Sequence, residues 1–98
     1  MLAIVSTEDN ISKLDQIRKN NLNLCGLGDG VEGNTDMPTI VWLSYNVHGN
    51  EASSTEVAMK LLYEMVSGKN QQLNEWLKHT IVIVDPCLNP DGRDRYVN

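Results

Sequence analysis

His48 and Glu51 are the residues whose types and spacing could bind a metal ion. They stand three positions apart in the segment V-H-G-N-E, between an apolar run and an amphipathic segment. An imidazole and a carboxylate at this spacing can point into one space, and zinc accepts both kinds of ligand. The simpler alternative is that Glu51 lies in the first turn of a helix, where its negative charge interacts favourably with the helix dipole. The pair is therefore a candidate for two of the three protein ligands of a catalytic zinc.

The elements around this pair predict a strand, a tight turn and a helix. Residues 39–45 are rich in β-branched and aromatic side chains with little alternation, which is typical of a strand covered on both faces in a parallel sheet. The helix that follows the turn is predicted to end at Gly68. Its expected apolar face comprises Val57, Ala58, Leu61, Leu62 and Met65.

A second apolar run, residues 80–85, completes a predicted strand–helix–strand crossover. Parallel strands end at the same edge of a sheet, so the His48 turn and the segment Asn89–Gly92 should meet there. The letters N-P-D-G predict a type I turn at this second position. His79 precedes its strand, and we expect it at the surface of the opposite edge.

The first 38 residues predict a strand, a helix and a loop. Residues 2–5 form a short apolar run, Ser6 and Thr7 offer a helix N-cap, and a helix is expected to about Asn20. The Gly-rich stretch 23–38 contains the letters G-x-G-x-x-G. A dinucleotide site needs a strand before these glycines and a helix after them. The order here is the reverse, so a surface connection is predicted instead.

Composition limits the remaining possibilities. The 98 residues suffice for one domain, and their 41% hydrophobic and 21% charged content is ordinary for a globular chain. A net charge of -5 argues against nucleic acid as a partner. Neither a membrane span nor a signal peptide is predicted, and the compartment stays undetermined. Cys25 and Cys87 lack the spacing of a zinc or redox motif and are interpreted as free thiols.

The two ends of the sequence lead to a further expectation. A strand opens directly after Met1, and the last residues, 96–98, carry no helix stop or turn signal. We therefore expect residues 1–98 to form part of a domain in a longer protein.

Taken together, these motifs resemble the zinc carboxypeptidase family, the carboxypeptidase A-like metallopeptidases. The resemblance rests on H-G-N-E at residues 48–51 and on N-P-D-G at residues 89–92, about forty residues later. It implies a three-layer α/β/α fold with a mainly parallel sheet and one zinc ion. The ligands that it implies are His48, Glu51 and a second His from a later strand.

The resemblance also implies that a later Glu serves as general base and that Arg residues recognise the terminal carboxylate of a peptide or protein substrate. No residue up to Asn98 is assigned to these roles, and Arg93 and Arg95 follow the N-P-D-G motif too closely. The isolated chain is therefore predicted to be inactive. Two alternatives remain open: a non-catalytic binding domain with this fold, and a related zinc amidase that cleaves non-peptide or cell-wall amides.

A last expectation concerns the sheet. In the family, the strand at residues 80–85 lies between the first strand and the strand at residues 39–45, which pairs with further strands beyond. Those further strands are not among these residues, so one edge should be open. Such an edge recruits another chain, and self-association is expected there.

Overall fold

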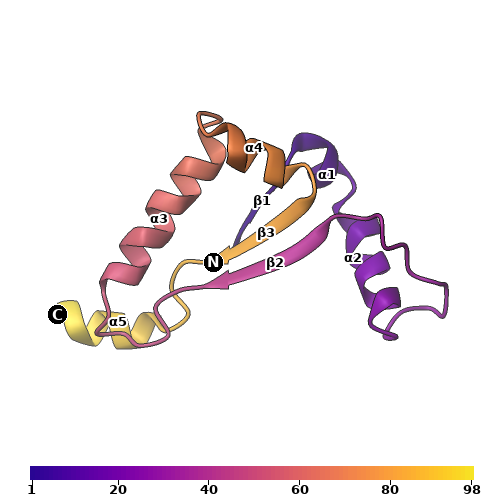
Figure 1. Cartoon of the computed structure of the whole chain (residues 1–98). Helices are drawn as coiled ribbons and strands as arrows, with labels where there is room; N and C mark the ends of the chain where they lie inside the picture. Colours follow the sequence, from indigo (N-terminus) through magenta and orange to yellow (C-terminus); the bar gives the residue numbers. More distant parts are fainter.

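The computed structural model describes residues 1–98, which form three strands and five helices (Figure 1). In chain order these are β1 (Ala3–Val5), α1 (Glu8–Ser12), α2 (Leu14–Leu24), β2 (Thr39–Ser44), α3 (Ser53–Val66), α4 (Gln71–Leu77), β3 (Thr80–Asp85) and α5 (Pro90–Val97). The predicted unit of strand, helices and strand is β2, α3, α4 and β3. None of the five helices has the length and apolar character that crossing a bilayer requires.

The sheet has the order β1-β3-β2 and is mixed. β2 runs parallel to β3, with Thr39 opposite Thr80, whereas β1 runs antiparallel to β3, with Ala3 opposite Val84. The expectation of a mainly parallel sheet is therefore wrong. In the antiparallel register the residue after β1 lies beside the start of β3, where the Ser6 hydroxyl donates to the carbonyl of Thr80 at 2.7 Å. This bond holds the carboxyl end of β1 at the amino end of β3.

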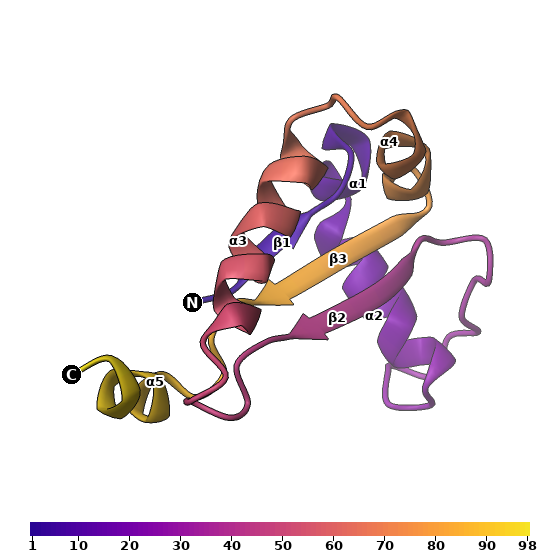
Figure 2. The same cartoon turned by 60° about the vertical axis from the view of Figure 1, so that its left-hand side comes forward.

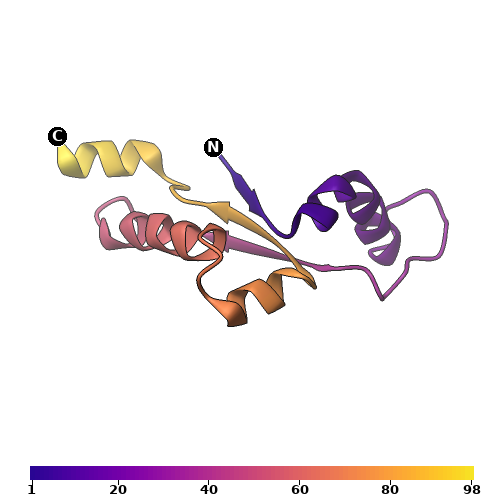
Figure 3. The ribbon, with the colours of Figure 1, turned by 90° about the horizontal axis from the view of Figure 1, so that it is seen from above.

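Helices lie on both faces of this sheet. Seen from above, α3 and α4 lie on one side, and α1 and α2 lie on the other (Figure 3). On the α2 side, Ile17 is 2% exposed and faces Ile81 and Ile83 of β3 and Ile40 of β2. The expected three-layer arrangement of helix, sheet and helix is present in this form.

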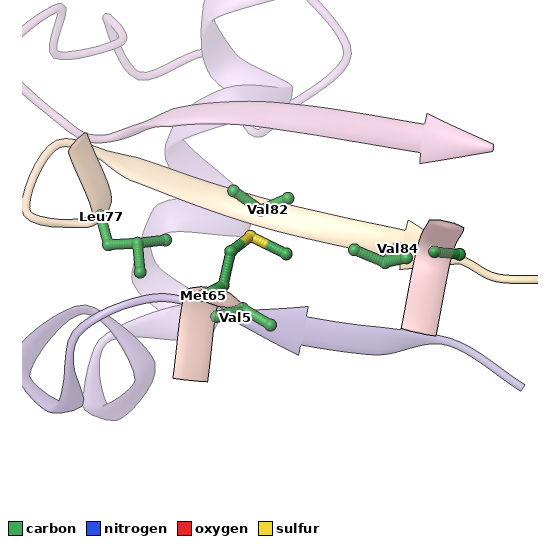
Figure 4. Packing of buried hydrophobic residues seen from close by; sticks show 6 residues of the cluster. Val5, Met65, Leu77, Val82 and Val84 are labelled. Carbon is green, nitrogen blue, oxygen red and sulfur yellow. The ribbon is translucent and has the colours of Figure 1, made fainter. Parts of the chain in front are cut away.

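The main core lies between the sheet and the α3–α4 side. Figure 4 shows Met65 of α3 and Leu77 of α4 beside three valines from the two strands β1 and β3. With Ala58, these residues form one buried cluster: Val5, Ala58, Met65, Leu77, Val82 and Val84. Val57 was expected on the same face of α3, but it is 54% exposed, so the predicted apolar stripe was too wide by that residue.

The first helical segment is broken where one continuous helix was predicted. Thr7 caps α1 as expected, and its hydroxyl accepts the N–H of Asn10. The Asn10 amide is buried and donates to the carbonyls of Leu77 and Lys78, both at 3.1 Å. α1 is thereby tied to the α4–β3 junction, while α2 must place Ile17 on the sheet. The chain changes direction between the two at Lys13, whose ψ is 13°.

α2 extends to Leu24, beyond the predicted end near Asn20, and the rest of the Gly-rich segment, residues 25–38, connects α2 to β2 without helix or strand, as predicted. Its backbone is tied to α2 at Asn34, which exchanges hydrogen bonds with the Asn20 side chain at 2.6 and 2.9 Å. No helix begins after the glycines, so the segment lacks the helix N-terminus that holds a pyrophosphate. This agrees with the rejection of a dinucleotide site.

β2 forms an open edge of the sheet, as expected, but its side chains are largely exposed, so the expectation that both of its faces are covered is wrong. Thr39 N–H donates to the carbonyl of His79, just before β3, at 3.0 Å, and Tyr45 N–H donates to that of Asp85, the last residue of β3, at 2.9 Å. Because successive strand residues alternate in this direction, Ile40, Trp42 and Ser44 present their backbone groups outward. Trp42 is 58% exposed, and no residue of β2 is charged. A strand edge without charge favours pairing with another strand.

We expect two copies of the chain to pair antiparallel through β2 around Trp42. In this register Trp42 pairs with Trp42 of the second copy and Ile40 pairs with its Ser44. Pro38, which has no N–H to donate, lies outside the paired residues. Sedimentation equilibrium should show the mass rising from 11.0 kDa toward twice that value as concentration increases. Trp42→Lys should abolish the rise, and Val57→Lys, at an exposed position on α3, should not. A constant monomer mass over a tenfold concentration range would rule out this interface.

Candidate metal half-site

The two motif loops meet at the carboxyl edge of β2 and β3. Residues 45–52 connect β2 to α3, and residues 86–89 connect β3 to α5; both pass below the sheet in Figure 2, where α5 lies near the start of α3. Leu88 N–H donates to the carbonyl of Tyr45 at 2.9 Å, and Asn89 N–H donates to that of Asn46 at 3.2 Å. The predicted meeting of the two loops at one edge is present.

The His48 turn is closed by its own backbone. Glu51 N–H donates to the carbonyl of His48 at 3.1 Å, so the two side chains emerge from one turn. The prediction placed Glu51 inside the first helical turn, but α3 begins only at Ser53. Glu51 therefore precedes the helix, and its carbonyl accepts the Ser54 hydroxyl at 3.2 Å. The helix dipole is consequently a weaker explanation for a carboxylate at this position.

His48 and Glu51 are both exposed, and neither side chain takes part in a hydrogen bond or ion pair. An ion pair lies in the first turn of α3, where Arg93 meets Glu56 at 3.1 Å. Arg93 also donates to the carbonyl of Ala52 at 2.8 Å and is 21% exposed. The imidazole and the carboxylate are thus free to bind a metal ion. Arg93 and Glu56, by contrast, pair with each other and connect α5 to α3.

Asn89 does more than start a turn. Its side-chain oxygen accepts the N–H of Gly92 at 3.0 Å, and its amide donates to the carbonyl of Val47 at 3.1 Å. Asn89 is thus the N-cap of α5, with Pro90 in the first turn, and the predicted type I turn continues as a helix. The reason is that the central dihedral angles of a type I turn lie close to helical values.

Gly49 and Gly92 are packed against each other where the two loops cross. Gly49 is buried, and a Cβ atom at this position would collide with the backbone of Gly92. Glycine is therefore required at residue 49 for close approach of two backbones. The H-G-N-E and N-P-D-G motifs thus contact each other through their glycines.

Other candidate residues lie away from the pair. His79 is exposed and precedes β3, at the opposite edge, as predicted. Both cysteines are free: Cys25 is exposed in the loop after α2, and the Cys87 thiol lies 3.2 Å from the side-chain oxygen of Asn46. No group of three or more His, Cys, Asp or Glu residues comes together in residues 1–98. The donor set therefore fits two positions of a zinc site, one nitrogen and one oxygen.

The sequence interpretation missed Asn46, Arg93 and the capping role of Asn89. A signal existed for Asn46, because asparagine tolerates a left-handed backbone better than most residues, and its φ is 55°. Arg93 had no comparable local signal, since its partners lie 37 and 41 positions away.

These features define a mixed α/β protein with a free His–Glu pair at the carboxyl edge of its sheet. The sequence model of the zinc carboxypeptidase family matches residues 3–98. The chain belongs to this family. No solved structure matches the chain.

Proposed function

We propose that residues 1–98 contribute part of the catalytic domain of a zinc-dependent metallocarboxypeptidase that hydrolyses C-terminal peptide bonds. The observation that carries this proposal is the His48–Glu51 pair: one turn presents a free imidazole and a free carboxylate at the carboxyl edge of β2. Family membership supports the zinc peptidase class. The substrate is a peptide or protein with a free C-terminus.

In this function His48 and Glu51 hold the zinc ion through a ring nitrogen and a carboxylate oxygen. Bound zinc supplies a Lewis acid that polarises the scissile carbonyl and makes water more acidic. Two contacts between the loops support the turn that carries both side chains: Gly49 packs against Gly92, and the Asn89 amide donates to the carbonyl of Val47. The third ligand and the general base are proposed to lie outside these residues, so the chain alone is proposed to be inactive.

The isolated chain is expected to bind zinc weakly, because two protein ligands leave half of a tetrahedral shell to water. Isothermal titration calorimetry with ZnCl₂ measures this affinity. His48→Ala should remove the heat of binding, whereas His79→Ala, an exposed histidine at the other edge, should preserve it. Tight one-to-one binding that survives His48→Ala would show that the ligands are elsewhere and would contradict the proposed site.

A further inference from the structure

We propose that Asn46 is the positioning residue of this site, which holds the His48–Glu51 turn in shape and couples it to the loop before α5. The inference rests on the proposed zinc function. Asn46 directly follows β2 and Tyr45 and is 3% exposed, one of two buried polar residues of the chain. It precedes His48 by two positions and therefore lies between the sheet and the candidate ligands.

The Asn46 side chain spans both ends of the ligand turn. Its amide nitrogen donates to the carbonyl of His48 at 3.1 Å and to that of Glu51 at 3.3 Å. One planar group thus fixes the distance between the backbones of the two proposed ligands. A carboxamide has two N–H donors, and both find a carbonyl acceptor here.

The Asn46 backbone adds a second constraint. Its N–H donates to the Ser54 hydroxyl at 2.9 Å, in the first turn of α3, and its φ of 55° is left-handed. This conformation turns the chain sharply from the direction of β2 into the ligand turn. Asparagine adopts it at lower cost than β-branched or bulky residues do.

Asn46 also joins the turn to the second motif loop. Its side-chain oxygen accepts the Cys87 thiol at 3.2 Å, and its carbonyl accepts the N–H of Asn89 at 3.2 Å. Each hydrogen-bonding group of Asn46 therefore contacts a different part of the site. A displacement of residues 87–89 is transmitted through Asn46 to the carbonyls of His48 and Glu51.

The control for this inference is Asn10, the other buried polar residue with a donating amide. Asn10 makes three side-chain hydrogen bonds, to Ser6, Leu77 and Lys78, at the opposite edge of the sheet. Asn10→Ala removes a network of similar size without touching the ligand turn. Urea unfolding of both variants identifies any effect that is due to lost stability alone.

The experiment compares Asn46→Gly with Asn10→Ala in the 98-residue chain by NMR. Glycine keeps the left-handed backbone accessible and removes only the side chain. Without zinc, hydrogen exchange of the Glu51 amide, which is bonded to His48, should become faster in Asn46→Gly and stay unchanged in Asn10→Ala. On titration with ZnCl₂, the dissociation constant read from the His48 ring signals should rise about 10-fold in Asn46→Gly alone, the lower range for residues that support metal ligands.

A second variant, Asn46→Asp, keeps the oxygen that faces Cys87 and a residue that tolerates the left-handed region, but it removes both N–H donors. It should reproduce the faster exchange at Glu51. If neither Asn46 variant alters Glu51 exchange, or if Asn10→Ala weakens zinc binding equally, the positioning role is overturned. If the unmodified chain shows no zinc-dependent change at His48, zinc binding by these two residues alone is refuted, and the exchange data still decide the role of Asn46 in the turn.

Discussion

His48→Ala is expected to lower kcat/KM about 1000-fold in the complete protein to which we propose these residues belong. The reason is that zinc contributes several kcal/mol of charge stabilisation in the transition state, and each 1.4 kcal/mol is about tenfold in rate. The His48 side chain is exposed and makes no hydrogen bond, so its removal should cost activity without unfolding the chain. Hydrolysis of a peptide with a free C-terminus, measured with saturating zinc, gives the rate constants.

Two further variants make this test specific. His79→Ala should leave kcat/KM unchanged, because His79 lies at the other edge of the sheet. Glu51→Gln keeps the size of the side chain but weakens the oxygen ligand, so it should also reduce activity and lower the zinc content of the purified protein. Full activity of His48→Ala on the same peptide would refute the assignment of His48 as a ligand. A C-terminally amidated peptide should be a poor substrate for the unmodified protein.

Gly49→Ala is expected to have the largest effect on stability among changes at the site, about 3 kcal/mol in the free energy of unfolding. The added methyl group would meet the Gly92 backbone, which cannot move aside as a flexible side chain can. The loop before α5 would have to shift, and the hydrogen bond between the Asn89 amide and the Val47 carbonyl would open. Urea denaturation followed by circular dichroism measures the change.

The matched control is Asn50→Ala, one residue further along the same turn. Asn50 is exposed and its side chain makes no hydrogen bond, so this substitution should change stability by less than about 0.5 kcal/mol. Equal effects of the two substitutions would mean that the contact between Gly49 and Gly92 does not hold the loops together. Preserved zinc-dependent shifts at His48 in Gly49→Ala would lead to the same conclusion.

Local patterns in the sequence predicted most of the elements. The runs of β-branched residues at 39–44 and 80–85 form β2 and β3, because such side chains suit a pleated surface. Gly68 ends α3 with a φ of 69°, and Thr7 caps α1. These outcomes depend on residues close together in the chain. The meeting of the His48 turn with Asn89 also followed from sequence, since parallel strands end at one edge.

Tertiary contacts decided the direction of β1, the break at Lys13 and the hydrogen bonds that connect the two motif loops. β1 runs antiparallel to β3, a strand about 80 positions later in the chain, and the Ser6 hydroxyl binds the carbonyl of Thr80, 74 positions away; no local pattern encodes partners at such separations. The sequence by itself indicated His48 and Glu51 as candidate metal ligands. Only the tertiary structure showed that Asn46 bonds the carbonyls of His48 and Glu51 while it also contacts Cys87, because a hydrogen bond across 41 residues exists only after the strands have paired.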